Sequence, residues 1–370
     1  MALLSHYRPG SFFLATPARS VLATGAADVV TERDPDELAT LVTKLLADSD
    51  VPVAVGALPF DPADSPHVVL PEAVRWAGPP RAGTQCHIAS QPSPTAVEPW
   101  PAPAAYEDCV TRAVTRLSDG ELRKVVLART LRVTLDGPVD IRALLANLLC
   151  DNTHGYTYAV DLPSGSTLVG ASPELLLSRA GNVVVANPLA GTLARDPDPA
   201  IDRRNAEALL ASAKDQDEHV VVVEAVVEAL RPFCRRLNVA PRPSLVSTPA
   251  VWHLSTRITG ELIDSGVSAL RLASALHPTP AVCGTPPDRA RATIAELEPF
   301  DRGFYAGAVG WCDANGDGQW AVAIRCAEVA DSSLCLYSGA GIMPASQPHL
   351  ELAETSAKFR TLLRAMGLEL

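Results

Sequence analysis

Two long stretches of the chain place their apolar side chains with the period of an α-helix. Residues 212–230, SAKDQDEHVVVVEAVVEAL, open with a serine and several acidic side chains and continue into a long apolar face. Residues 349–366, HLELAETSAKFRTLLRAM, repeat this arrangement near the C-terminus. A polar cap, an acidic first turn and apolar positions three and four apart are typical of a helix that packs on a core. We therefore predict helices here, and further helices over residues 34–49 and 106–122.

Segments of another kind lie between these helices. Residues 124–135, KVVLARTLRVTL, are rich in β-branched side chains and alternate in part, which predicts a strand. Residues 155–162, 166–189 and 304–341 contain several short strand patterns, and the last of these segments holds the turn dipeptides Asn-Gly and Asp-Gly. Hairpins mixed with long helices indicate an α+β fold in which mostly antiparallel sheets are surrounded by helices.

The chain divides at a proline-rich stretch. Residues 91–108, QPSPTAVEPWPAPAAYED, contain five prolines and are predicted to form an extended connector. Before it, residues 1–105 combine one helical pattern with apolar strand candidates such as VPVAVGALPF. We expect this N-terminal segment to contribute to the same fold as residues 106–370, which we expect to form the catalytic core.

Charge and hydropathy exclude several function classes. The net charge of −11 argues against a nucleic-acid-binding protein, which needs a basic surface, and no polybasic patch is available for an anionic membrane. No apolar run reaches the ~18 residues of a membrane span. Arg8 and Pro9 stand where the apolar part of a secretory signal would be. We therefore expect a cytoplasmic protein with no nucleic-acid partner and no membrane partner.

The eight cysteines are scattered along the chain, and none forms a C-x-x-C pair. This spacing indicates neither a zinc ribbon nor a redox pair. Buried, reduced thiols are the expectation that remains.

Two pairs of acidic residues suggest a metal site. Asp215 and Glu218 are three residues apart at the start of one predicted helix, and Glu351 and Glu354 are three apart at the start of another. Residues three apart share a helical face. Carboxylates are favoured in any first helical turn, so one pair alone needs no metal. Two pairs offer the oxygen ligands that Mg²⁺ prefers, provided that the two helices meet, which the pattern does not decide.

Lysine is rare in this chain. Of the 31 basic residues only Lys44, Lys124, Lys214 and Lys358 are lysines. Arginine stays protonated in proteins, whereas lysine can lose its proton when its environment lowers its pKa. Each remaining lysine is therefore a candidate for a function that arginine cannot perform, with chance retention as the alternative.

A set of motifs in a fixed order resembles the chorismate-utilising enzyme family. The motifs are KVVLAR, GASPELLL, NPLAGT, SAKDQDEH, HPTPAVCGTP, ELEPFDRGFYAGAVGW, AIRCAE, SGAGIMPASQP and ELAETSAKF. They span residues 106–370, with a weaker match before them. The resemblance implies one large α+β unit whose antiparallel sheets and helices surround a Mg²⁺-dependent site for chorismate, a dianion.

The resemblance also implies roles for the acidic residues and for the base and acid of the reaction. Glu218 and Glu354 match direct Mg²⁺ ligands, while Asp215, where the family usually has Glu, and Glu351 match acids that act through metal-bound water. Lys124 matches a general base that activates water, provided that burial lowers its pKa. Its alternative is a strand-end lysine whose ammonium reaches solvent. Glu174 matches the general acid, its alternative being a turn carboxylate after a proline.

Further positions match residues that hold the substrate. Tyr305 and Arg325 match contacts to the enolpyruvyl carboxylate, for which the planar guanidinium of arginine is suited. A lone histidine such as His253 is more often a core residue, but here it matches a site histidine. The remaining matches to substrate-binding positions are Thr192, Ala281, Gly339, Gly341 and Lys358.

The choice of nucleophile separates the branches of the family. Ammonia-using members carry Gln where Lys124 stands, and the aminodeoxychorismate branch carries Lys where Ala190 stands. Lys124 therefore favours water as the nucleophile, and the implied product is isochorismate, formed by attack at C2 and loss of the C4 hydroxyl. Salicylate synthase, which carries Thr where Ala281 stands, and a non-catalytic chorismate-binding relative are the alternatives.

The resemblance also implies the oligomeric state and the protein partners. We expect a monomer without a glutamine amidotransferase, because water needs no ammonia-supplying partner. The product could feed either siderophore or menaquinone biosynthesis, and the motifs do not separate these two fates.

Overall fold

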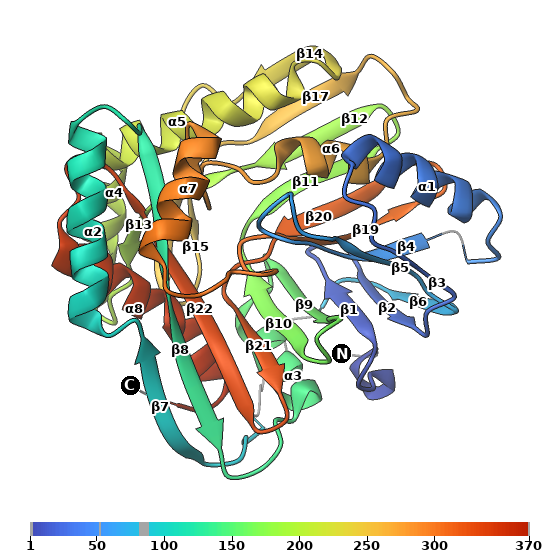
Figure 1. Cartoon of the computed structure of the whole chain (residues 1–370), viewed down its shortest axis with the longest axis horizontal. Helices are drawn as coiled ribbons and strands as arrows, with labels where there is room; N and C mark the ends of the chain where they lie inside the picture. Colours follow the sequence, from blue (N-terminus) through green and yellow to red (C-terminus); the bar gives the residue numbers. More distant parts are fainter. Residues whose placement is uncertain (1–2, 52, 81–88, 369–370) are drawn as a thin grey trace.

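A computed structural model describes residues 3–51, 53–80 and 89–368 of the chain (Figure 1). Several of its helices begin where the sequence supplies a capping side chain. The side chain of Asp34 accepts hydrogen bonds from the backbone N–H groups of Asp36 (3.0 Å) and Glu37 (2.9 Å), and that of Ser212 accepts one from Asp215 (3.3 Å). The helices are η1 (Leu4–His6), α1 (Pro35–Ala47), α2 (Pro103–Ser118), α3 (Ile141–Asp151), α4 (Pro199–Ala211), α5 (Ala213–Leu230), α6 (Ala269–Leu276), α7 (Pro287–Leu297) and α8 (Pro348–Ala365).

The predicted α+β class is confirmed, and within the described residues most strands belong to two large sheets of antiparallel neighbours. The first has ten strands, in the order β18 (Gly284–Thr285), β8 (Lys124–Leu135), β22 (Ser333–Ile342), β21 (Cys326–Ala330), β10 (Thr167–Ser172), β9 (Tyr156–Asp161), β1 (Phe12–Ala15), β2 (Ser20–Thr24) and β6 (Ala73–Ala77), with β7 (Pro94–Trp100) also paired to β8.

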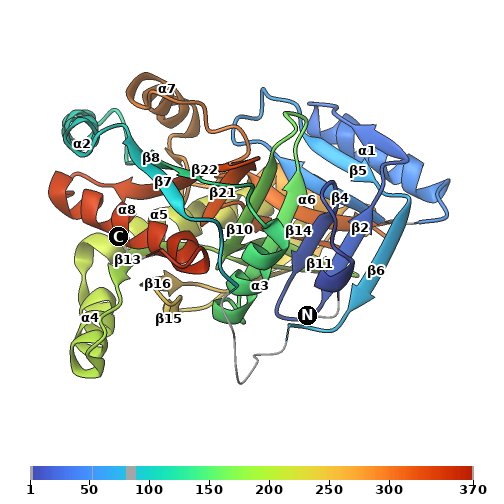
Figure 2. The same cartoon turned by 90° about the horizontal axis from the view of Figure 1, so that it is seen from below.

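The second sheet has nine strands in the described part of the chain, and a three-stranded sheet lies apart from it. The order of the nine is β14 (Cys234–Val239), β17 (Ile258–Leu262), β12 (Val183–Asn187), β11 (Leu175–Ala180), β20 (Gly318–Val322), β19 (Ala308–Asp313), β4 (Val53–Leu58), β5 (His67–Leu70) and β3 (Asp28–Val30). The order of the three is β13 (Leu189–Ala194), β16 (Val251–Ser255) and β15 (Ser244–Ser247). Helices α2, α4 and α8 lie on the left of Figure 1, although Figure 2 shows α2 and α4 at different depths, while α1 and α6 lie on the right.

Strands from the N-terminal segment lie in both large sheets. Strands β1, β2 and β6 form one edge of the ten-stranded sheet, and β3, β4 and β5 form one edge of the nine-stranded sheet. The proline-rich stretch, predicted to be only a connector, contributes β7, which pairs with β8. Proline lacks a backbone donor and is tolerated on such outer strands, which explains why the proline count concealed a strand.

Two neighbouring strand pairs carry the chain from one large sheet to the other. Strand β10 belongs to the ten-stranded sheet, and its continuation β11 belongs to the nine-stranded sheet, with Glu174 between them. Strand β20 of the nine-stranded sheet continues into β21 of the ten-stranded sheet, with Arg325 between them. Because β10 pairs with β21 and β11 with β20, the two crossing points lie side by side.

Successive side chains along the strands belong alternately to two hydrophobic cores. In β1, Phe12 and Leu14 belong to a core shared by both large sheets, whereas Phe13 and Ala15 belong to a second core. Successive side chains of a strand point to opposite faces, so one strand serves both cores. The second core also contains residues of α3 and α8, which cover that face of the ten-stranded sheet (Figure 2).

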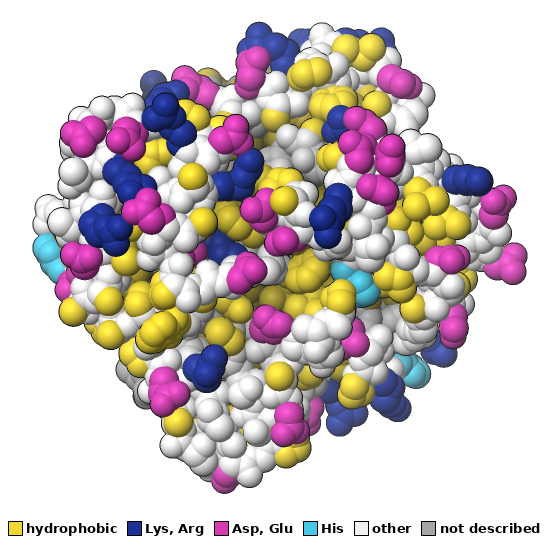
Figure 3. All heavy atoms as spheres, in the orientation of Figure 1, with side chains coloured by type: hydrophobic (Ala, Val, Ile, Leu, Met, Phe, Trp, Pro, Cys, Tyr) yellow, Lys and Arg dark blue, Asp and Glu magenta, His cyan; other side chains and the backbone are white. Residues whose placement is uncertain are grey.

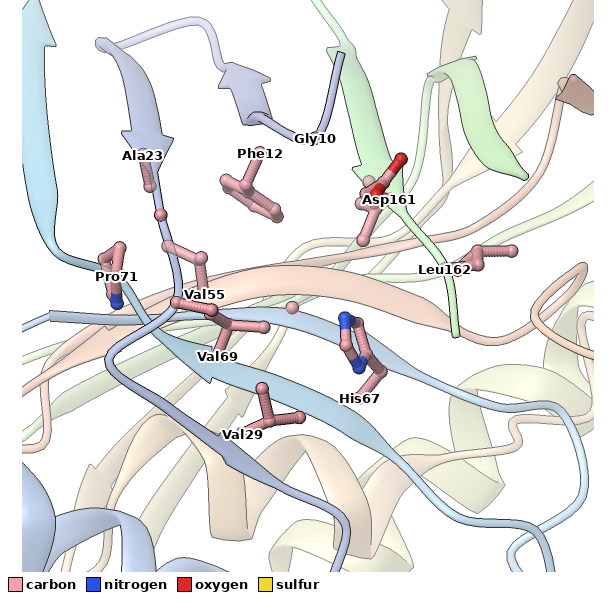
Figure 4. Close-up of a pocket in the computed structure, with 14 residues that line it drawn as sticks. Gly10, Phe12, Ala23, Val29, Val55, His67, Val69, Pro71, Asp161 and Leu162 are labelled. Atoms are coloured by element: carbon pink, nitrogen blue, oxygen red, sulfur yellow. The ribbon is translucent and has the colours of Figure 1, made fainter. Parts of the chain in front are cut away.

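A cavity of about 320 Å³ lies between strands of the two N-terminal edges and β9 (Figure 4). Phe12, Val55, Val69, His67 and Asp161 are among its lining residues. None of its lining residues belongs to the predicted site. The cavity is therefore a separate feature of the N-terminal segment.

The sequence predicted that the chain has no membrane-spanning segment and that its cysteines are reduced. Acidic and basic side chains are interspersed over the face shown in Figure 3. Within the described residues, no helix has the length and apolarity that crossing a membrane requires. Six cysteines of the described part of the chain are free thiols, as expected, but Cys150 is disulfide-bonded, so the expectation of reduced thiols fails there. Cys86 lies outside the described residues. Scattered spacing alone does not reveal a pairing that only the fold creates.

Candidate active site

Lys124 is the first residue of β8, and its side chain is completely buried. Strand β18 pairs with this end of β8 through Thr285, opposite Lys124. Nζ lies 2.9 Å from Oε1 of Glu218, and apart from this ion pair it has no hydrogen-bond partner among the described residues. A buried polar nitrogen with unused hydrogen-bonding capacity is costly, which indicates a place where a ligand completes the bonding.

A buried ion pair that sequence reasoning missed fixes this end of β8. Nε of Arg302 donates to Oε2 of Glu298 (2.8 Å), and the guanidinium also donates to the carbonyls of Val126 (2.8 Å) and Val282 (2.7 Å). The Glu298 carboxylate accepts from the N–H of Ala128 (2.7 Å). The pair thus ties β8 to the loop before β18. Both residues belong to the motif ELEPFDRG. In the sequence, however, a glutamate four residues before an arginine looks like an ordinary ion pair on a helix surface.

The two predicted acidic helices do meet. Glu218 is buried in the first turns of α5, and Glu351 is buried in the first turn of α8. Burial raises the pKa of Asp215, and the nearby charges of Glu218 and Glu354 raise it further, against hydrogen bonding by Ser212. Burial and then the charge of Glu354 raise the pKa of Glu351. Carboxylates of both helices therefore share one electrostatic environment.

Lysines accompany these acids. Nζ of Lys358 lies 2.6 Å from Oε1 of Glu354 and donates to the carbonyl of Gly339 (2.8 Å). Nζ of Lys214, which sequence reasoning left out of the site, lies 2.7 Å from Oε1 of Glu351. Burial lowers the pKa of Lys358 despite the opposing charge of Glu354. The rarity of lysine was the signal that could have identified Lys214.

Two glycines of β22 let the backbone come close to these side chains. A Cβ at Gly341 would overlap Oε1 of Glu218 and would lie 2.9 Å from Cε of Lys124. A Cβ at Gly339 would lie 2.9 Å from the hydroxyl of Tyr305. Side chains larger than hydrogen would therefore collide with Glu218, Lys124 and Tyr305.

Glu174 lies buried at one crossing point between the large sheets. Its Oε1 accepts a hydrogen bond from the N–H of Leu189 (3.3 Å), and its carbonyl accepts one from Val322 (3.1 Å). Burial raises the pKa of Glu174 to about 7, and the nearby charges of Lys124 and Arg325 limit the rise. A carboxyl that keeps its proton near neutral pH is suited to act as a general acid.

Arg325 lies at the other crossing point with a positive φ of 53°. Its Nη2 lies 2.8 Å from Nε2 of His253, and its buried Nε has no partner among the described residues. Burial, and then the charge of Arg325, hold the pKa of His253 well below its usual value. Because a guanidinium only donates, Nε2 of His253 accepts this hydrogen bond and Nδ1 carries the proton. The Nδ1–H group can donate to Oγ1 of Thr192 (3.0 Å) or to the carbonyl of Gly191 (3.3 Å).

Tyr305 and Ala281 complete the predicted set. The ring of Tyr305 is buried and stacks on Tyr337 with 4.8 Å between ring centroids. Ala281 lies half-buried in the loop between α6 and β18, where its N–H donates to Thr279 Oγ1 (3.3 Å). This loop leads directly into the strand beside Lys124. No hydrogen bond or ion pair joins Ala281 to the other predicted residues in the described ranges.

The oxygen donors available to a divalent cation are the four carboxylates at the starts of α5 and α8. No group of three or more His, Cys, Asp or Glu side chains forms a ready metal cage within the described residues. The four carboxylates nevertheless fit Mg²⁺, which takes few direct protein oxygens and keeps several waters. Burial first, and then repulsion from neighbouring carboxylates, raise the pKa values of Asp215 and Glu351, and a cation at this place would relieve that repulsion.

Comparison with known proteins places the chain among related sequences and structures. A family model described as "Chorismate binding enzyme" matches residues 82–367. Isochorismate synthase DhbC of Bacillus subtilis is 49% identical over 99% of this chain and 96% of its own, and isochorismate synthase EntC of Escherichia coli K12 is 39% identical over 97% and 95%. A solved structure from Bacillus anthracis, described as a candidate 2,3-dihydroxybenzoate-specific isochorismate synthase DhbC, is 46% identical with a TM-score of 0.94, covering 100% of this chain and 99% of that one.

Proposed function

The chain belongs to the chorismate binding enzyme family, and from this premise we propose that it is an isochorismate synthase. It converts chorismate into isochorismate: water attacks C2, the ring double bond shifts, and the C4 hydroxyl leaves as water after taking up a proton. One water molecule is consumed and one is released. The bond types are alike on both sides, so the reaction is freely reversible.

One observation carries this proposal: a buried lysine and a carboxyl with a strongly raised pKa share one site. Lys124 Nζ is buried without a hydrogen-bond partner beyond its ion pair with Glu218, among the described residues. The pKa of Glu174 is raised to about 7 by burial and responds to the charge of Lys124. Water is a weak nucleophile that needs a base, and hydroxide is a poor leaving group that needs an acid. The site offers one group for each task.

In this proposal Lys124 accepts a proton from the attacking water, and Glu174 donates a proton to the leaving C4 hydroxyl. Lys124 extends from β8, and Glu174 from the crossing between β10 and β11. The two groups come from separate elements, so the flat ring of chorismate can lie between them. Both are held in place by buried backbone, which favours a preorganised geometry.

The substrate carboxylates have separate partners. The unused Nε of Arg325 and the hydroxyl of Tyr305 are the donors proposed for the enolpyruvyl carboxylate. His253 orients the guanidinium of Arg325, since its Nε2 can only accept. Thr192 in turn contacts Nδ1 of His253 through its hydroxyl (3.0 Å) and so helps to orient the ring. Lys358, Gly339 and Gly341 line the approach, where absent side chains leave space for the ring.

The four acids are the proposed ligands of Mg²⁺, with Glu218 and Glu354 direct and Asp215 and Glu351 acting through water. When bound, the ion supplies positive charge that neutralises the second substrate carboxylate and orients the ring. Glu218 would hold the ion, and in the metal-free protein it contacts Nζ of Lys124. Metal binding and base positioning are thus linked through one carboxylate.

Product analysis tests the proposed function. The purified protein is incubated with chorismate and MgCl₂, and the products are separated by chromatography. Isochorismate in equilibrium with chorismate is the expected result. Salicylate with pyruvate as the main products would support the salicylate synthase alternative, and unchanged chorismate would support a non-catalytic relative.

A further inference from the structure

Three of the four lysines of the chain lie in the site, and each pairs with a different glutamate. The pairs are Lys124 with Glu218 (2.9 Å), Lys214 with Glu351 (2.7 Å) and Lys358 with Glu354 (2.6 Å). The fourth lysine, Lys44, lies exposed on α1. The acidic cluster is therefore already neutralised in large part by side chains of the protein itself.

Lys214 differs from the other two lysines in its surroundings. Its side chain is 30% exposed, whereas those of Lys124 and Lys358 are 0% and 9% exposed. Its partner Glu351 is 2% exposed. Lys214 also lines a pocket of about 510 Å³ together with Arg123, Asp217 and residues Met343 to Ala345. Lys214 alone of the three thus pairs with a buried acid while having open space beside it.

We propose that Lys214 is a tethered counter-cation that holds Glu351 in the metal-free protein and moves to Asp217 when Mg²⁺ binds. The inference rests on the proposed metal site, and it assigns a function to a residue outside that ligand set. Lys214 acts as a positioning residue, because it works through Glu351.

The ion pair stabilises the metal-free site and opposes the metal. A buried carboxylate left without a partner is strongly destabilising. Glu351 also feels the charge of Glu354, which adds to the effect of burial in raising its pKa. Lys214 relieves this repulsion. The same carboxylate cannot fully serve an ammonium and a hydrated Mg²⁺ together, so the ammonium competes with the ion.

Asp217 offers the displaced ammonium a second partner. It is three residues after Lys214 on α5, and residues three apart share a helical face. Both residues line the same pocket. Asp217 is exposed, and no hydrogen bond or ion pair to its carboxylate occurs within the described residues. The move therefore exchanges a buried partner for a solvent-exposed one without leaving the ammonium unpaired.

The test is the apparent affinity for Mg²⁺ without chorismate, measured from the melting temperature as MgCl₂ is added at constant ionic strength. A ligand that binds only the folded state stabilises it by RT ln(1 + [L]/Kd), so the rise of the melting temperature with MgCl₂ concentration gives the apparent affinity. Lys214→Met is expected to melt lower than the unmodified protein without metal and to need on the order of tenfold less Mg²⁺ for the same shift. Lys44→Met is the matched control and is expected to change neither value.

Two further variants separate ion-pair competition from a simple change of charge. Lys214→Arg keeps a cation that can pair with Glu351, so it is expected to stay close to the unmodified protein in Mg²⁺ affinity. Asp217→Asn removes the second partner and is expected to weaken Mg²⁺ binding. That weakening should disappear when Asp217→Asn is combined with Lys214→Met, since a double-mutant cycle isolates the coupling.

The outcomes distinguish this inference from the proposed metal site. The inference is overturned if Lys214→Met binds Mg²⁺ no more tightly than the unmodified protein, or if Lys214→Arg tightens binding as much as Lys214→Met. If instead MgCl₂ does not raise the melting temperature of the unmodified protein, and Glu218→Gln and Glu354→Gln behave like it, the metal site itself fails whatever Lys214 does.

Discussion

Nζ of Lys124 lies 2.9 Å from Oε1 of Glu218, so the proposed base and a proposed metal ligand share one buried ion pair. The lysine comes from the start of β8 and the glutamate from α5. Gly341 lies against both side chains, where a Cβ would overlap the carboxylate. This contact connects the proposed proton transfer by Lys124 with the proposed metal binding by Glu218.

Replacing Lys124 tests the base. Lys124→Gln and Lys124→Arg are each expected to lower the turnover number at least about 100-fold, because neither side chain can accept a proton at neutral pH. Turnover is measured as isochorismate formation at saturating chorismate. Lys44→Arg serves as the control for an exposed lysine. A Lys124→Arg variant with a near-native rate would show that the position supplies only positive charge.

Glu174 predicts a pH dependence of both activity and stability. Its pKa of about 7 in the folded state exceeds the ordinary value of 4.5 because the carboxyl is buried. Protonated Glu174 is the acid, so kcat/KM is expected to fall as pH rises through about 7. The stabilisation from the neutral carboxyl is fully present below the unfolded pKa and is lost as pH rises through the folded pKa.

Glu174→Gln separates these two effects, since glutamine stays neutral and can still accept from Leu189. The variant is expected to lose turnover, while its melting temperature falls less than that of the unmodified protein between about pH 4 and pH 8, because the unfolded pKa of 4.5 and the folded pKa of about 7 both lie in this window. The difference in unfolding free energy at the upper end amounts to about 3 kcal/mol. Equal pH dependence of melting in both proteins would remove Glu174 as the titrating group.

The carboxylates predict loss of activity on metal removal. EDTA is expected to abolish turnover, and MgCl₂ in excess is expected to restore it, because Glu218 and Glu354 are the proposed direct ligands. Glu218→Gln and Glu354→Gln are expected to lower turnover about 100-fold or more at low Mg²⁺ while the far-ultraviolet circular dichroism is retained. Glu37→Gln, an exposed first-turn glutamate of α1, is the matched control. Full activity of the EDTA-treated protein would contradict the metal assignment.

Ala281 predicts product specificity. A threonine there would add a methyl and a hydroxyl in the loop that leads to β18, the strand beside Lys124. Small shifts of a bound intermediate change rates strongly. Ala281→Thr is therefore expected to release more pyruvate and salicylate than the unmodified enzyme, measured through NADH consumption by lactate dehydrogenase. Ala295→Thr on α7 is the control, and equal pyruvate from both variants would show that position 281 does not govern elimination.

Patterns within single segments predicted much of this molecule. The helix start at Ser212 and the long strand from Lys124 follow from local capping and alternation, and the structure has both. The meeting of α5 with α8 was left open, because the spacing of Asp215 and Glu218 describes one helix face and not its neighbour. The resemblance supplied the site residues, but their contacts come from the crossing of strands between the sheets.

Other features have no local pattern. The hydrogen bond between Arg325 and His253 joins residues 72 positions apart, and neither segment alone indicates it. The buried ion pair of Arg302 with Glu298, which holds β8, looks in the sequence like an ordinary ion pair with the spacing of a helix. Lys214 was visible only as one of four lysines. Its pairing with Glu351 depends on how two helices pack.

The origin of the new hydroxyl tests the central claim most directly. The enzyme is incubated with chorismate and MgCl₂ in water labelled with heavy oxygen, and isochorismate is isolated before the reverse reaction exchanges the label widely. Mass spectrometry with fragmentation is expected to place one heavy oxygen on C2, because Lys124 directs solvent water there. Isochorismate that forms without the label, or the absence of isochorismate among the products, would contradict the account.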